Sequence, residues 1–554
     1  MMDIFNIIFL ILFKIYAMLS ILYSYLDRFL INSQVIFYSF FILSICVIIF
    51  LIYPKKINFV QFDNVKLGKI FLVSGIILSM LAVMPISGKG YDVPDFIYQL
   101  KNIKEFGIGY LFTYIDRPLY YIFAWFLSII LPLPERIIIS ITGVIGAGFL
   151  AFSSYVFTKK AFNNTLIGGL AALFTANMYG ITQMSICYIT NIFGLSCAIL
   201  YLSSLIDIFN KKDIKSMVIS TILIMITVLV YPVASIISLF IFSVLYTFNI
   251  ITSRRIIHIK EMFLFILHGS IYLIIISLLP KNITVATSLI QSSSFSLFYS
   301  YVVNNTSWES IWIVLPALIG YIFIAKMKIN ISTQIIISWV VATLVLSLAL
   351  STYRDRIIMY MPYSILSAVT IASLFTYIKQ KNIPYIKITS ILLILMIVPS
   401  LRFSGPVQML RQYTERGPFP WDTVFAEEKQ EVWVTQNFDI NKIVVVSNID
   451  WLHHDLNNFP KLTVGVFYRA FAEFGSNIYG GNLEDLIRNN YTGTGVLDFP
   501  YTENKSFKDR TVIIIDTIYH FSPKDKEILI ETSMPGVYIM KEISPMEELD
   551  WLMK

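Results

Sequence analysis

The chain has 554 residues, of which 56% are hydrophobic and 14% are charged, and its mean hydropathy is +0.72. A soluble protein of this length is about one quarter charged, so the composition excludes a soluble enzyme and a disordered chain. The three cysteines all lie in apolar segments, which excludes a disulfide-built secreted domain.

Charge divides the chain into two parts. Residues 1–400 carry 27 Lys and Arg against 13 Asp and Glu, whereas residues 401–554 carry 15 against 22. This division predicts a large membrane region followed by a more polar domain. The two parts have opposite net charge, so the basic isoelectric point gives no indication of a nucleic-acid partner.

The membrane region is predicted to form about 13 transmembrane helices. A spanning helix needs about 20 mostly apolar residues. The segments that come close to this length are Ile4–Tyr25, Ser33–Tyr53, Leu67–Ser87, Arg136–Phe157, Thr165–Thr182, Ser185–Phe209, Ser216–Tyr231, Pro232–Phe248, Met262–Leu279, Ile311–Ala325, Gln334–Ser351, Ile357–Thr376 and Ile386–Leu401.

Lys and Arg in the loops predict the orientation. With a cytoplasmic N-terminus, the inner loops hold 17 basic residues against four acidic ones, and the outer loops hold nine against eight. Cytoplasmic loops carry the excess of Lys and Arg, so this orientation is favoured for a protein of the cell membrane. An odd number of spans then places the C-terminal domain outside the cytoplasm.

One further apolar segment, Leu119–Leu133, could also cross the bilayer. If it did, every later loop would change sides and 13 basic residues would move outside. The segment is therefore predicted to lie along or dip into the outer surface, as aromatic interfacial helices do.

Two aspartates lie in the first large outer loop. Asp92 and Asp95 flank Pro94, and Asp95 precedes a predicted helix, Phe96–Phe106, that ends at Gly107. They can be ordinary turn and cap residues. Alternatively, a carboxylate at the membrane surface can act as a general base toward a hydroxyl, and two carboxylates can hold a divalent cation.

Three arginines lie where outer loops re-enter the membrane. Arg117 precedes Pro118 and the interfacial segment, and Arg354 and Arg356 flank Asp355 in a very short loop. Such cations can bind a lipid phosphate. They can equally pair with the neighbouring aspartates or anchor the helices at the headgroups.

Four segments, in this order, give the chain a resemblance to a known family. They are YDVPDFIYQLKNIKEFG, DRPLYYIFAWFLSII, SYVFTKKAF and YRDRIIMYMPYSILSA. The pattern resembles the GT-C superfamily of membrane glycosyltransferases, which includes protein O-mannosyltransferases and the lipid A aminoarabinose transferase. The resemblance covers residues 67–401 and leaves two additional transmembrane helices in residues 1–66.

The resemblance implies roles for these residues. Asp92 matches the catalytic and metal-associated acid, with Asp95 next, and the cation would be Mg or Mn. Arg117 matches the residue that contacts the carrier phosphate, and Arg354 or Arg356 matches the late basic residue at the mouth of the active site. The chain departs from the pattern in that the two acids stand three residues apart, and Asn191 stands where many members have an acid.

Residues 402–554 are predicted to be an extracytoplasmic α/β domain. The expected elements are a helix over Pro418–Gln436 and buried strands at Ile443–Val446, Thr511–Ile515 and Val537–Met540. Their order favours a small, partly parallel sheet.

The predicted function is sugar transfer from a polyprenyl-phosphate-linked donor to a glycan, lipid or protein acceptor at the extracytoplasmic face. Two alternatives are a lipid or polysaccharide transporter without catalysis, and a non-catalytic scaffold for the C-terminal domain. Few charges lie near the middle of the predicted spans, which argues against an ion-coupled transporter.

Overall fold

The computed structural model describes most of the helical region and parts of the C-terminal domain. The described residues are 30–32, 38–45, 47, 63–84, 87, 93–115, 117–176, 178, 181, 184, 189–211, 213–253, 259–279, 308–327, 330–349, 357, 359–380, 430, 433–434, 436–438, 443–447, 511–515 and 529–540. The chain forms two compact units, one of residues 1–88 and 103–408 and the other of residues 89–102 and 409–554.

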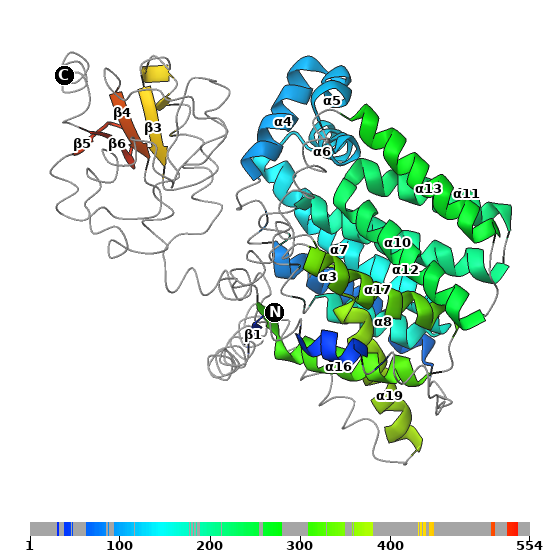
Figure 1. Ribbon diagram of the computed structural model, residues 1–554. Helices are drawn as coiled ribbons and strands as arrows, with labels where there is room; N and C mark the ends of the chain where they lie inside the picture. Colours follow the sequence, from blue (N-terminus) through cyan, green and yellow to red (C-terminus); the bar gives the residue numbers. More distant parts are fainter. Residues whose placement is uncertain are drawn as a thin grey trace. The chain divides into compact units, whose positions relative to one another are not determined.

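The first unit is a bundle of apolar helices (Figure 1), and ten of the predicted spans coincide with a helix in it. These helices are α3 (Val65–Val83), α7 (Glu135–Phe162), α8 (Thr165–Thr175), α10 (Ile189–Lys211), α11 (Ile214–Val230), α12 (Pro232–Ser253), α13 (Ile259–Leu278), α16 (Ile311–Lys326), α17 (Ile331–Ala349) and α19 (Tyr363–Gln380). Among the described residues, six helices are long and apolar enough to cross a membrane. The protein is therefore a multi-pass membrane protein.

Three predicted spans are not tested in this way. Ile4–Tyr25 and Ile386–Leu401 lie outside the described residues, and so does most of Ser33–Tyr53. The predicted number of 13 spans therefore stays a prediction.

Glycines allow a close helix contact in the bundle, between α3 and α8. A Cβ atom on Gly68 would lie 2.4 Å from the Thr165 carbonyl oxygen, and one on Gly75 would lie 2.4 Å from the Ala172 carbonyl carbon. The two helices therefore run parallel, with their backbones touching. Small residues allow the two backbones to approach this closely. The resulting van der Waals packing stabilises the helix pair, because lipid provides no hydrophobic driving force between helices.

The contact between α3 and α7 bears on whether α6 (Pro118–Ile130) crosses the membrane. Ser87, just after α3, donates a hydrogen bond from Oγ to the carbonyl of Ser140 near the start of α7, at 2.8 Å. Gly148, further along α7, faces Met80 and Ile76 of α3, so the two helices are antiparallel. Because α6 has 13 residues, it is about 20 Å long, too short for a hydrocarbon core of about 30 Å. The short α6 and the antiparallel α3 and α7 agree with the expectation that this segment is not a span, which stays a prediction.

A short antiparallel ladder joins two loops that the sequence places on the outer side. It pairs β1 (Leu30–Asn32) with β2 (Trp308–Ser310), with Ile31 opposite Glu309. The two loops therefore share one side of the bundle. Which side faces the cytoplasm stays a prediction.

The second unit contains a four-stranded sheet in the order β3-β4-β6-β5. Its strands are β3 (Ile443–Ser447), β4 (Thr511–Ile515), β5 (Leu529–Glu531) and β6 (Val537–Met540). β3 and β4 are parallel, whereas β6 is antiparallel to both of its neighbours. The three predicted strands and the partly parallel sheet are confirmed. The predicted helix Pro418–Gln436 lies mostly outside the described residues, so the α/β class of the whole domain stays a prediction.

Candidate functional site

The structure describes the side chain of one predicted site residue, Arg117. Asp92, Arg354 and Arg356 lie outside the described residues, so the predicted convergence of these groups stays a prediction. Asp95 lies in α4 (Val93–Phe106), which begins earlier than the predicted start at Phe96. The expectation that Asp95 caps this helix is therefore wrong, because Asp95 lies inside its first turn.

The apolar positions predicted for α4 are largely buried. Phe96, Ile97, Leu100 and Ile103 are each at most 1% exposed, whereas Phe106 at the end of the helix is 63% exposed. Gly107 follows with φ at +77°, a conformation that favours glycine. The predicted end of this helix is thus confirmed.

Arg117 is held by contacts with two other parts of the bundle. It stands at the N-cap position of α6, with Pro118 as the first helical residue. Its Nη1 donates to Thr190 Oγ1 in the first turn of α10, at 3.1 Å. Its guanidinium carbon lies 5.3 Å from the ring centre of Tyr231, which joins α11 to α12. An arginine stacked on an aromatic ring keeps a fixed orientation, which suits recognition of a phosphate or carboxylate.

α6 is fastened to α7 through Tyr120. The Tyr120 hydroxyl lies 2.9 Å from Thr142 Oγ1, and the Thr142 hydroxyl donates to the carbonyl of Ile139 at 2.6 Å. Tyr120 therefore donates to Thr142. Burial of the phenol raises the pKa of Tyr120 well above its usual value, although the nearby charge of Arg117 acts in the opposite direction. The hydroxyl stays protonated and the link stays intact over the physiological range.

An apolar groove begins directly beside Arg117. It has a volume of about 440 Å³ and is lined by Leu119, Tyr120, Ile122, Phe123, Trp125, Phe126, Phe193 and Val230, here called the α6 groove. Three elements form it: α6, α10 through Phe193, and α11 through Val230. Phe193 and Val230 are near neighbours in sequence of Thr190 and Tyr231, so the same two elements hold the guanidinium and line the groove.

Asn191 contributes a buried amide at the same end of α10. Its side chain is 1% exposed, and its Nδ2 has no hydrogen-bond partner among the described residues. A buried polar group without a partner is costly, so such a group in a native protein calls for an explanation. The sequence singled out this position only by the resemblance.

The predicted divalent cation has no further support in the geometry. Among the described residues, no group of three or more His, Cys, Asp or Glu side chains could hold a metal ion. The two predicted ligands are Asp92, which is not described, and Asp95, of which only the backbone is described.

Sequence reasoning singled out Arg117 as a candidate but not the residues around it. Thr190, Tyr231 and Phe193 lie more than 70 positions away in the chain, and no spacing rule links them to Arg117. Tyr120 carried a signal, because a tyrosine inside an apolar helix needs a partner for its hydroxyl.

No family model and no curated protein matches this chain. Among solved structures, it is similar to the oligosaccharyltransferase of Archaeoglobus fulgidus in the apo form and in complex with Zn and sulfate. Identities are 14% and 13%, coverage is 72% and 71% of this chain and 64% and 62% of that chain, and the TM-score is 0.47 for both. The chain thus spans less than two thirds of the length of that protein in these two structures.

The same archaeal protein, AglB, is also matched in complex with an inhibitory peptide and a dolichol-phosphate. That match has 13% identity over 81% of this chain and 69% of that chain, with a TM-score of 0.47. The chain is also similar to ArnT from Cupriavidus metallidurans, at 10% identity over 86% of this chain and 98% of that chain, with a TM-score of 0.48. Both proteins are of the GT-C superfamily that the sequence pattern resembles.

Proposed function

We propose that this protein is an integral membrane glycosyltransferase. It moves a sugar from a polyprenyl-phosphate-linked donor to a glycan, lipid or protein acceptor at the extracytoplasmic face. The observation that carries the proposal is the position of Arg117, a cation fixed by Thr190 and Tyr231 at the start of the apolar α6 groove. A polyprenyl phosphate has the same two parts, an anionic head and a long apolar chain.

The proposed donor site has two parts, a group of arginines for the phosphate and the α6 groove for the apolar chain. Arg117, together with Arg354 or Arg356, would hold the phosphate through charge-assisted hydrogen bonds. The α6 groove would hold the first units of the apolar chain, since its lining is almost wholly aliphatic and aromatic. Paired with cations, the carrier phosphate is a good leaving group when the acceptor attacks the sugar carbon.

The acceptor side rests on the two aspartates. Asp92 or Asp95 would accept the proton of the acceptor hydroxyl as it attacks, giving direct displacement with inversion. A divalent cation, Mg or Mn, held by these carboxylates would offset the phosphate charge. Asn191, whose buried amide lies next to Thr190, is a candidate for a hydrogen bond to the donor.

The donor site can be tested by binding before the sugar is known. Arg117→Gln should weaken binding of a short-chain polyprenyl phosphate to the purified protein about 10- to 100-fold, because one charge-assisted contact is lost. Binding of the matching polyprenol, which lacks the phosphate, should not change. The control is Lys159→Gln, because Lys159 also lies over a tyrosine ring, 5.6 Å from the centre of Tyr155. Lys159 is in the last turn of α7, whereas α6 contacts α7 near its start. Equal losses for both variants would contradict the assignment.

Catalysis is tested separately with Asp92→Asn and Asp95→Asn. One of these variants should abolish transfer from a panel of radiolabelled polyprenyl-phosphate hexoses while it still binds the polyprenyl phosphate. Full transfer by both variants would show that the catalytic assignment is wrong. If function is lost only when residues 402–554 are removed, the alternative of a non-catalytic scaffold for the C-terminal domain would be favoured.

A further inference from the structure

Two interruptions of helical structure lie around one small cavity in the middle of the bundle. α8 ends at Thr175, and Met178 follows outside any long helix. α19 begins at Tyr363, after a turn that contains Met361 and Pro362. Met178, Met361 and Pro362 all line the cavity, whose volume is about 10 Å³. Irregular backbone at membrane depth is tolerated only where protein or a polar cavity surrounds it.

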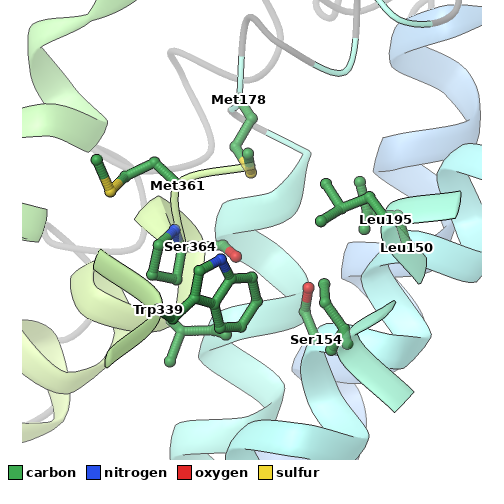
Figure 2. A pocket seen from close by; sticks show the side chains of 10 residues that line it. Leu150, Ser154, Met178, Leu195, Trp339, Met361 and Ser364 are labelled. Carbon is green, nitrogen blue, oxygen red and sulfur yellow. The ribbon is translucent and has the colours of Figure 1, made fainter. Parts of the chain in front are cut away.

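Two serines supply polar groups to this cavity. Ser154 of α7 and Ser364 of α19 are 1% and 4% exposed, and both line the cavity. Figure 2 shows their hydroxyl oxygens turned toward the space beside Trp339, with Leu150, Leu195 and the two methionines around it. The rest of the lining is apolar, so the two hydroxyls are the side-chain oxygens that face it.

The two hydroxyls differ from several others in the surrounding helices. In a helix surrounded by apolar groups, serine ordinarily donates to the carbonyl three or four residues earlier. Ser153, the neighbour of Ser154, does so, to the carbonyl of Phe149 at 2.8 Å, and Thr343 does so, to that of Trp339 at 2.9 Å. Ser154 and Ser364 have no hydrogen-bond partner among the described residues. The indole N–H of Trp339 is not available to them, since it donates to the carbonyl of Tyr360 at 2.7 Å.

We propose that the cavity binds one water molecule, which bridges the hydroxyls of Ser154 and Ser364 and so links α7 to the start of α19. A cavity of about 10–15 Å³ holds one water, and that water needs two to four polar partners. The volume, the two buried hydroxyls and their shared direction meet these conditions. The bridge fixes the turn that begins α19.

The test is a structure of the full-length protein at a resolution that shows ordered water. A density peak within hydrogen-bond distance of both serine oxygens is expected in the wild type and should be lost in the double variant Ser154→Ala, Ser364→Ala. The proposal is overturned if no peak lies between the two oxygens, or if either hydroxyl donates to a carbonyl of its own helix instead.

Thermal unfolding gives a second readout. Ser154→Ala and Ser364→Ala should each lower Tm by about 1–3 °C. The double variant should lose less than the sum, because either change alone removes the bridge. Ser153→Ala is the matched control, and its effect should add to that of Ser364→Ala. Additive losses for the 154 and 364 pair would overturn the bridge.

Discussion

At Tyr120, one phenol hydroxyl joins α6 to α7 through Thr142. Tyr120→Phe removes this hydrogen bond but keeps the ring, so we expect a loss of about 0.5–1.5 kcal/mol in the free energy of unfolding. The contribution also depends on pH. Because the pKa of Tyr120 is raised in the folded protein, the stability is fully present below the ordinary tyrosine pKa of about 10 and is lost as pH rises toward the higher folded value.

Thermal unfolding at pH 8 and at pH 11 checks this prediction. The stability difference between wild type and Tyr120→Phe should shrink or reverse at the higher pH. Thr142→Val is the matched control, because it removes the partner and leaves the phenol in place, so it should keep the alkaline sensitivity. An equal loss of stability with pH in wild type and Tyr120→Phe would contradict the assignment.

At the scale of single elements, the contact between α3 and α8 depends on glycine. A Cβ atom at Gly75 would lie 2.4–2.6 Å from three backbone atoms of Ala172 and Leu173, which cannot move without moving α8. We expect Gly75→Ala to destabilise the protein by more than about 2 kcal/mol, as overpacking does. A Cβ atom at Gly269 of α13 would meet nothing within 4 Å, so Gly269→Ala should be neutral or stabilising by up to about 1 kcal/mol. Unfolding of both variants in detergent gives the comparison, and similar effects would contradict the close contact.

A buried histidine ties α13 to its neighbours. His268 is 0% exposed, with Nδ1 2.9 Å from the Tyr201 hydroxyl and Nε2 3.2 Å from Thr221 Oγ1. Thr221 donates its own proton to the carbonyl of Met217, so it must accept from Nε2. The neutral ring therefore carries its proton on Nε2, and Tyr201 donates to Nδ1.

This assignment predicts a coupling between two residues. His268→Leu should destabilise the protein by about 1–3 kcal/mol, because the Tyr201 hydroxyl loses its acceptor. Adding Tyr201→Phe should recover part of the loss, with a coupling of about 0.5–1.5 kcal/mol. Thermal unfolding of the two single variants and the double variant measures it. Strictly additive losses would mean that the two side chains do not interact.

Hydropathy predicted the helices better than it predicted their contacts. The bilayer requires long apolar helices, so α3, α7, α10 and α17 could be read from composition alone. The neighbours of each helix could not, because nearly every face of such a helix is apolar, and Gly68 or Thr190 looks ordinary in sequence. Arg117 could be singled out as a candidate because a charge beside an apolar segment stands out, whereas its partner Tyr231 does not.

For the molecule as a whole, α10 relates the candidate site to the membrane. Its first turn holds Thr190, the partner of Arg117, and its last residue is Lys211, which pairs with Asp207 at 3.3 Å. The helix rises by about 32 Å over the 21 residue steps from Thr190 to Lys211, close to the thickness of the hydrocarbon core. We therefore expect the Arg117 site and the Lys211 end to lie near opposite faces of the bilayer. Since the loops on the Lys211 side are predicted to hold the excess of basic residues, the positive-inside rule predicts that the Arg117 site lies outside the cytoplasm.

Cysteine labelling tests this orientation. Phe106 and Lys211 are both well exposed, and they lie on the sides predicted to be outer and inner. In intact cells, a membrane-impermeant maleimide should label Phe106→Cys at least about tenfold more than Lys211→Cys. After the membrane is opened, both should react, which controls for intrinsic reactivity. The native cysteines lie in predicted spans, so the unsubstituted protein should give a low background. The reverse pattern would place the Arg117 site on the cytoplasmic side. The carrier phosphate would then have to bind from the cytoplasmic leaflet, not from the extracytoplasmic one that we propose.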